Sequence, residues 1–260
     1  CIDLYRFLLA GIMFQIDDIR EKNIDKFYEI YLSGGKLKLI EAIAEGLGKR
    51  SYFTIDSNGT IKRKNMNHAL PLITTINNDN YKEIIKIVLE KMVDLTQREK
   101  IKKIERLSKY SIDTLTNNFN KIMANGDKIF GLRYSKEIFL RDNQLFFKML
   151  FDYVLLENID SEKATMAWSL YQLIKEIEDD KLPDEVFYVG ISYILQRKSE
   201  FHDFERISNL NFTPTPKAEI IELSKTIDSL SVSSYAKILN EFRYEKEDIY
   251  TEILKERCKN

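Results

Sequence analysis

The chain is poor in the residues that interrupt regular secondary structure, since its 260 residues include only nine glycines and four prolines. Loop-rich and all-β proteins use both residues in their turns, so this scarcity argues against them and favours long helices. Cysteine is rarer still: Cys1 and Cys258 lie near the two ends. They form neither a disulfide framework nor a metal-ligand spacing, and we therefore expect a reducing, cytoplasmic compartment.

Long apolar runs and an excess of one charge are also missing. The apolar run from Phe7 to Ile16 is far shorter than the roughly 20 residues that cross a bilayer, so we expect no membrane partner. Basic and acidic residues nearly balance, at 40 and 41, and the formal net charge is −1. Because no global positive field attracts nucleic acid, any RNA binding has to come from local patches.

Several familiar catalytic signatures do not occur in the sequence. There is no glycine-rich phosphate loop, no dinucleotide fingerprint, no zinc-ligand spacing and no Gly-x-Ser-x-Gly turn. These absences argue against ATPases, Rossmann enzymes, zinc enzymes and serine hydrolases of the usual types. Neither a metal nor an organic cofactor is predicted.

The residues that are present predict a mainly α protein, a multi-helix bundle or a helical array. Apolar residues recur at helical spacing through most of the chain, and the aromatic residues between 139 and 168 follow this spacing, which predicts core. Residues 51–63 differ, because β-forming segments flank an Asn-Gly turn and predict one small β-hairpin. We expect a single mainly helical unit over residues 1–260, with a candidate subdivision near 126–134.

Both histidines of the chain lie five residues after an arginine. The two elements are Arg63-Lys64-Asn65-Met66-Asn67-His68 and Arg197-Lys198-Ser199-Glu200-Phe201-His202. Arginine and histidine together can cleave RNA without a metal, because one handles the proton and the other the phosphate charge. Both elements resemble the signature of the HEPN ribonucleases, which include CRISPR-associated and abortive-infection effectors. That signature is arginine, usually a polar residue, three to five further positions and histidine.

The resemblance covers six residues at each element and implies an all-helical, metal-independent endoribonuclease of a bacterial defence or toxin system. It assigns catalysis to His202, as general acid or base, and to Arg197, at the charge that develops on the phosphate. Two such motifs usually face each other in this family, which implies either a homodimer or a second half-site built from Arg63 and His68. Five residues of a continuous helix turn through about 500°, so Arg197 and His202 converge only near a helix end.

Basic residues predict contacts to the RNA backbone. Several belong to an amphipathic helix that opens with a capping box at Thr96 and continues to Tyr110. Its apolar stripe indicates that one face packs inward, and a solvated outer face is the simpler interpretation of its charges. The predicted RNA-binding residues are Lys62, Lys64, Lys198, Arg98, Lys102 and Arg106.

Two other classes of protein fit the same sequence. A non-catalytic helical protein that binds a partner or joins a larger assembly agrees with the missing catalytic motifs and the near-zero net charge. A helical nucleic-acid-binding module agrees with the basic residues at 62–64 and 98–109. Catalysis requires Arg197 and His202 to be exposed in a cleft, opposite a second copy or His68, whereas the non-catalytic hypothesis predicts that they point apart into solvent.

Overall fold

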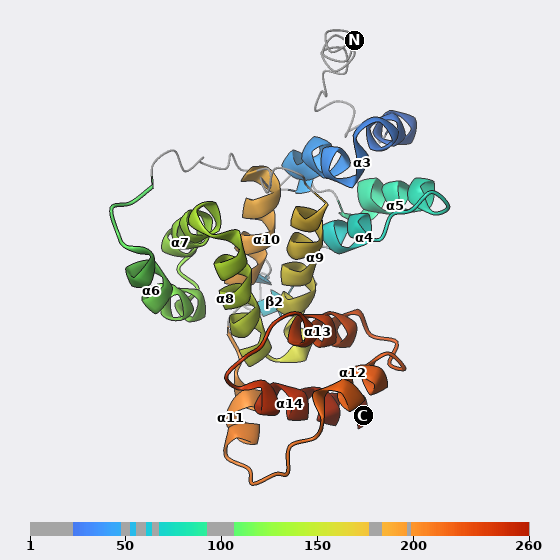
Figure 1. Cartoon of the computed structure of the whole chain (residues 1–260). Coiled ribbons are helices and arrows are strands. Elements are labelled where there is room, and N and C mark those ends of the chain that lie inside the picture. The colour runs from blue at the N-terminus through green and yellow to red at the C-terminus, as the bar shows by residue number, and fades with distance from the viewer. Residues whose placement is uncertain are drawn as a thin grey trace. The chain divides into compact units, whose positions relative to one another are not determined.

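The computed structural model describes residues 23–47, 53–55, 61–63, 68–92, 107–176, 184–196 and 199–259 (Figure 1). These residues are mainly helical, which confirms the mainly α part of the predicted fold class. The chain divides into two compact units: unit 1 is Cys1–Arg50 with Asn67–Glu99, and unit 2 is Ser51–Met66 with Lys100–Asn260. Residues 126–134, where the sequence suggests the subdivision of a single unit, lie within unit 2.

Unit 1 is helical in its described part. It contains α3 (Ile24–Leu47), α4 (Ala69–Thr74), α5 (Tyr81–Ile87) and a π-helical turn, η1 (Val88–Met92). Gly35 has φ 70° and ψ −167°, so α3 consists of two helical segments joined by a kink. A residue with a Cβ rarely adopts this φ, which explains the glycine. The Tyr28 ring stacks on the Tyr81 ring with 4.1 Å between centroids and ties α3 to α5.

Unit 2 contains two short strands and most of the described helices. In chain order its elements are β1 (Phe53–Ile55), β2 (Ile61–Arg63), α6 (Ile112–Asn125), α7 (Lys128–Arg141), α8 (Asn143–Leu156), a 3-10 turn η3 (Ile159–Ser161), α9 (Lys163–Lys175), α10 (Asp184–Gln196), α11 (His202–Ser208), α12 (Lys217–Ser224), α13 (Leu230–Glu241) and α14 (Glu247–Lys259). β1 and β2 pair antiparallel, with Phe53 opposite Arg63. The turn between them lies outside the described residues. Two strands alone are marginal in water, so this pairing adds little stability.

Local sequence sets the boundaries of α6, α7 and α8. Ser111, Asp127 and Asp142 precede these helices, and the side-chain oxygen of each accepts a hydrogen bond from a backbone N–H of the first turn. Such caps satisfy donors that have no partner within the helix. Gly126 follows α6 in the left-handed conformation with φ 65°, where glycine commonly ends a helix.

The core of unit 2 is aromatic, as the helical spacing predicts. Its buried rings come from α7, α8, α9 and α10 and include Phe139, Phe146, Phe147, Phe151, Tyr171 and Phe187. Many meet edge to face, as do Phe139 and Phe146 at 5.7 Å and 82°, which is a favourable arrangement for aromatic quadrupoles. These rings stabilise the core and are not available to stack nucleic-acid bases.

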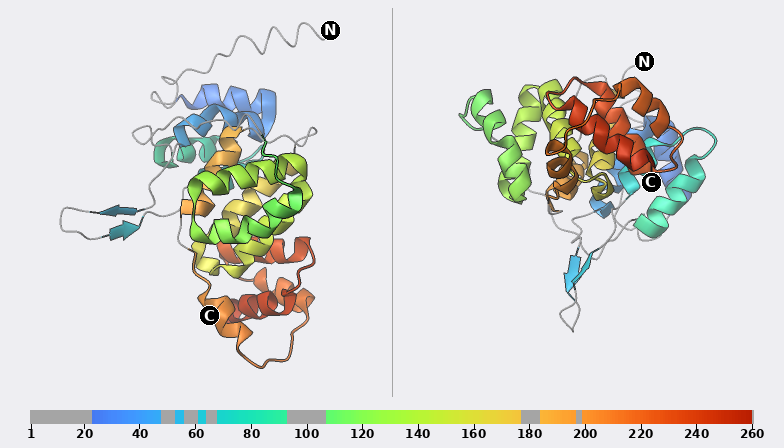
Figure 2. Two further views of the ribbon diagram at one scale, coloured as in Figure 1. Left: turned by 90° about the vertical axis from the view of Figure 1, so that its left-hand side faces the viewer. Right: turned by 90° about the horizontal axis from the view of Figure 1, so that it is seen from below.

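Helices α7 to α10 lie side by side in unit 2, and the C-terminal helices cover one end of them (Figure 1). α13 packs on α8 and α9, and α14 packs on α11, α12 and α13. Figure 2 shows α11 against α14 from two further sides. The connection from α10 to α11 therefore passes from one helical layer to the next. None of the described helices is long and apolar enough to cross a membrane.

An ion-paired carboxylate ties α9 to α13. Glu241 Oε1 accepts a hydrogen bond from Tyr171 OH at 2.6 Å and another from Lys175 Nζ at 2.7 Å. Burial by itself would raise the pKa of Glu241, but the hydrogen bonds from Lys175 and Tyr171 outweigh burial and hold the pKa below the usual 4.5. A depressed pKa in the folded state contributes stability above pH 4.5, and this contribution is lost as the pH falls through the folded pKa.

We expect Glu241→Gln to be less stable than the wild type by about 0.5–1 kcal/mol near neutral pH, since the pair is partly exposed. The difference should shrink as the pH falls through the folded pKa, because the wild-type carboxylate then protonates as well. Urea unfolding over a series of pH values measures it. Glu222→Gln is the matched control, because its pair with Lys225 is 70% and 64% exposed. An equal pH dependence in both variants would contradict the prediction.

Candidate functional site

The second Arg-His element joins α10 to α11. α10 ends at Gln196, Arg197 and Lys198 lie outside the described residues, and His202 is the first residue of α11. α10 thus ends before the arginine, and α11 begins at the histidine. The large rotation that a continuous helix would impose between them does not apply.

His202 is exposed at the start of α11. Within the described part of the chain its imidazole makes no hydrogen bond and no ion pair. Farther along the helix, Arg206 forms an ion pair with Asp203 of α11 at 3.2 Å and another with Glu256 of α14 at 2.5 Å. The pair with Glu256 holds α11 against α14. The imidazole is therefore accessible to solvent and to a bound substrate, on a helix whose position is set by its neighbours.

A buried ion pair contacts the connection that precedes His202. The side chains of Lys163, at the start of α9, and Glu157, just after α8, are fully buried, and Lys163 Nζ lies 2.5 Å from Glu157 Oε1. Tyr153 OH donates to the same carboxylate oxygen at 2.8 Å. Burial raises the pKa of Tyr153 well above its usual 10.0, and the charge of Glu157 raises it further, so the phenol stays protonated. Two donors thus stabilise the carboxylate, as a buried charge requires.

The same groups bind the backbone between the arginine and the histidine. Ser199 Oγ lies 2.6 Å from Tyr153 OH and 3.5 Å from Lys163 Nζ. The second carboxylate oxygen of Glu157 accepts the backbone N–H of Glu200 at 3.0 Å. We call Tyr153, Glu157, Lys163 and Ser199 the anchor cluster. It fixes this connection to α8 and α9.

The anchor cluster has the composition of some nucleophilic sites, but its geometry favours a structural role. A serine nucleophile needs a neighbouring base that takes its proton. Lys163 forms an ion pair with the buried carboxylate of Glu157, and Tyr153 keeps its own proton because burial raises its pKa. Neither group that lies near Ser199 in the described part of the chain can act as that base.

The first Arg-His element is not assembled in the same way. Arg63 is the last residue of β2 and belongs to unit 2, whereas His68 is half-buried, directly precedes α4 and belongs to unit 1. The two residues thus fall in different units, in contrast to the helical setting that the resemblance implies. Among the four predicted catalytic residues, His202 has a described and exposed side chain.

Most of the predicted RNA-binding residues lie outside the described part of the chain. These are Lys64, Lys198, Arg98, Lys102 and Arg106, while Lys62 is described only as the middle residue of β2. Residues 107–110 are not helical, so the prediction that the basic helix continues to Tyr110 is wrong. The physical reason is the cap at Ser111, which starts a new helix, α6.

A pocket of about 410 Å³ lies in unit 2 along the outer face of α8. Four of its residues, Leu145, Lys148, Met149 and Asp152, recur at the spacing that places them on one face of the helix. The others come from α6 and from the connection between α13 and α14: Asn120, Arg243, Tyr244, Glu245 and Lys246. We call this the α8 pocket. Sequence reasoning missed it.

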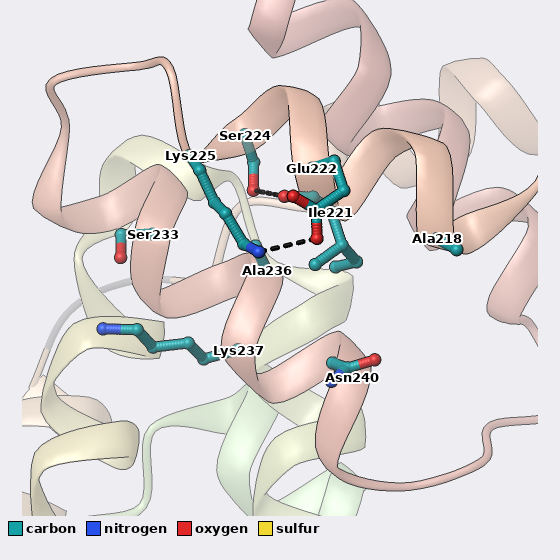
Figure 3. A pocket seen from close by; sticks show the side chains of 9 residues that line it. All are labelled: Ala218, Ile221, Glu222, Ser224, Lys225, Ser233, Ala236, Lys237 and Asn240. Atoms are coloured by element: carbon teal, nitrogen blue, oxygen red, sulfur yellow. Dashed lines mark hydrogen bonds and ion pairs between the residues drawn. The ribbon is translucent and has the colours of Figure 1, made fainter.

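A second pocket, of about 380 Å³, lies between α12 and α13 (Figure 3). Its apolar lining includes Ala218, Ile221 and Ala236. Lys225 reaches back to Glu222 with 2.6 Å between the charged atoms, so one of its two lysines is neutralised. We call this the α12–α13 pocket. It serves below as the comparison for the α8 pocket, whose lining holds three basic residues.

Comparisons with known proteins do not identify a relative: no protein-family model matches the chain, and no similar curated protein or solved structure was found. Within the described residues, no group of three or more histidine, cysteine, aspartate or glutamate side chains is placed to hold a metal ion. The function is therefore inferred from the exposed His202, the anchor cluster beside it and the two pockets.

Proposed function

We propose that this chain is a metal-independent endoribonuclease of the HEPN type, acting in a bacterial defence or toxin system. The proposal depends chiefly on the position of His202, which is exposed at the start of α11 and follows a connection that the anchor cluster holds. Arg197 directly follows the last residue of α10. In the sequence, Arg197 thus follows the end of one helix and His202 begins the next, and in this proposal their side chains bind the same phosphate.

In this proposal the RNA supplies its own nucleophile. His202 accepts the proton of the 2′-OH, the 2′-oxygen bonds to the adjacent phosphorus, and the bond from phosphorus to the 5′-oxygen breaks. Arg197 stabilises the negative charge on the phosphate oxygens through its planar donors. The departing 5′-oxygen takes a proton from a second, protonated imidazole. The products are a 2′,3′-cyclic phosphate and a 5′-hydroxyl.

The second imidazole comes from another copy of the chain in this proposal. The alternative, a half-site within one chain, requires Arg63 and His68 to act as a pair. Arg63 ends a strand and His68 precedes a helix of the other unit. Each chain then has one functional Arg-His pair, Arg197 with His202. Two copies of the chain supply the two imidazoles, so a homodimer is the simpler assembly.

A non-catalytic interaction subunit is the second candidate, and one observation favours it. Ile129 and Phe130, at the start of α7, are 64% and 52% exposed. Two adjacent, exposed apolar side chains are suited to a protein partner, although single exposed apolar residues are common on protein surfaces. This candidate requires no chemistry at His202.

The test is cleavage of mixed-sequence single-stranded RNA in EDTA. We expect the wild type to cut it and leave cyclic phosphate ends, and Arg197→Ala to lose this activity because the phosphate charge is no longer stabilised. Lys237→Ala, which removes an exposed lysine of the α12–α13 pocket, should cut at the wild-type rate. Undiminished cleavage by Arg197→Ala would contradict the proposal. A wild-type protein that cuts no RNA would favour the interaction subunit.

A further inference from the structure

Three basic side chains meet in the α8 pocket: Lys148 from α8, and Arg243 and Lys246 from the connection between α13 and α14. All three are exposed. Within the described part of the chain, Lys148 and Arg243 form no ion pair and no hydrogen bond. Like charges that line one pocket repel each other. An anion bound among them relieves this repulsion, so its electrostatic binding free energy is more favourable than beside a single lysine.

The two acidic residues of the pocket lower the formal charge of its lining from +3 to +1, but neither forms an ion pair with Lys148 or Arg243 within the described residues. Asp152 accepts a hydrogen bond from Tyr250 OH at 2.8 Å, which directs one of its oxygens toward α14. Glu245 is exposed and forms no ion pair within the described residues. By contrast, the α12–α13 pocket holds two lysines, one of which is paired with Glu222. With three basic and two acidic residues against two basic and one, each lining has a formal net charge of +1. The α8 pocket differs in that it gathers three basic side chains, of which Lys148 and Arg243 form no ion pair within the described residues.

The lining of the α8 pocket suits a nucleotide better than a bare anion. Leu145 and Met149 are half-buried and give apolar surface between the cations, on which a base or a ribose can pack. Asn120 contributes an amide, which both donates and accepts hydrogen bonds. A volume of about 410 Å³ lies within the range of small-ligand sites.

The pocket adjoins the helix that begins with His202. Lys246 Nζ lies 4.9 Å from the centre of the Phe204 ring, and Phe204 is two residues after His202 on α11. The Phe204 ring in turn packs on Tyr250 with 6.2 Å between centroids, and Tyr250 binds the pocket residue Asp152. Residues two apart on a helix point to different sides of it, so this contact places the pocket beside α11, and an RNA strand cut at His202 reaches it by passing around that helix.

We propose that the α8 pocket binds one nucleotide of the single-stranded RNA that is cut at His202. Lys148, Arg243 and Lys246 hold the phosphodiester, and Leu145 and Met149 contact the base or ribose. This inference takes its substrate from the proposed function. A free nucleotide offers the same phosphate chemistry, so the experiment below distinguishes a strand from a mononucleotide.

Binding is measured apart from cleavage, on the full chain carrying His202→Ala. The probe is a fluorescein-labelled, twelve-nucleotide single-stranded RNA, followed by anisotropy over a series of salt concentrations. Replacing Lys148, Arg243 and Lys246 together with alanine should weaken binding about 10–100-fold at low salt. The plot of log K against log salt should become shallower, its slope decreasing in magnitude by about 2, because each of three phosphate contacts contributes about 0.7. The matched control is Lys225→Ala with Lys237→Ala, which should leave both quantities unchanged.

Each result supports or overturns the inference. Unchanged affinity and salt slope in the triple variant would overturn it, whether or not the wild type cleaves RNA. Displacement of the probe by an equal nucleotide concentration of uridine monophosphate would identify a free-nucleotide site and overturn the RNA assignment. If RNA binding depends on the three basic residues but the wild-type protein does not cleave RNA, the α8 pocket is an RNA-binding site and the proposed function is contradicted. Equal thermal unfolding midpoints exclude loss of folding, since all three side chains are exposed.

Discussion

Replacing Lys163 with methionine is expected to lower the free energy of unfolding by about 3–5 kcal/mol. The Lys163 and Glu157 side chains are fully buried with 2.5 Å between the charged atoms, so the substitution leaves a buried carboxylate without its counter-charge. Tyr153 cannot replace the ammonium, because it contributes one hydrogen bond and no charge. Urea unfolding at neutral pH, with the slope compared between variants, measures the loss.

Two controls show whether the unpaired charge is the cause. The double variant Glu157→Gln with Lys163→Met should be more stable than Lys163→Met alone, because no buried charge remains. Lys225→Met breaks the exposed pair with Glu222 and should change stability by less than about 1 kcal/mol. A Lys163→Met protein as stable as the wild type would show that the buried pair contributes nothing to folding.

Replacing His202 with alanine is expected to slow RNA cleavage about 10²–10⁴-fold, the usual contribution of a general acid or base. The same change should alter the free energy of unfolding by no more than about 0.5 kcal/mol, because His202 is exposed and forms no hydrogen bond or ion pair within the described residues. Cleavage rates in EDTA and urea unfolding are measured on the same preparation. A fall in rate that is matched by a loss of stability would point to unfolding instead.

The variant His68→Ala separates the two arrangements of the second half-site. If two copies of the Arg197 and His202 element face each other, His68→Ala should cut RNA at the wild-type rate. A loss as large as that of His202→Ala would assign the second imidazole to His68 of the same chain. Sedimentation of the wild type under the cleavage conditions then checks whether the active species is a dimer.

The sequence by itself determined the helical class. Glycine and proline are scarce and leave few breaks, and the apolar spacing predicted the aromatic core. Gly126 ends α6 in the left-handed conformation that glycine favours. These features act over a few residues, since a cap or an apolar stripe depends on near neighbours in the chain. The predicted C-terminal end of the basic helix was wrong for a reason that is also local, because Ser111 caps a new helix.

Only the tertiary structure decided which polar residues meet. The sequence predicts that the aromatic helices, including the one with Tyr153, belong to the core. It gives no sign that Glu157 and Lys163 form an ion pair, because they belong to different elements and are six residues apart, a spacing that no single helix brings together. Lys148 lies between core aromatic residues in the sequence. Its helical spacing to Leu145 and Asp152 could have indicated that the three residues share an outer face of α8. Arg243 and Lys246 reach that face because α13 packs on α8, a contact between segments distant in sequence. Burial and long-range packing determine both sites, and neither is a local property of the chain.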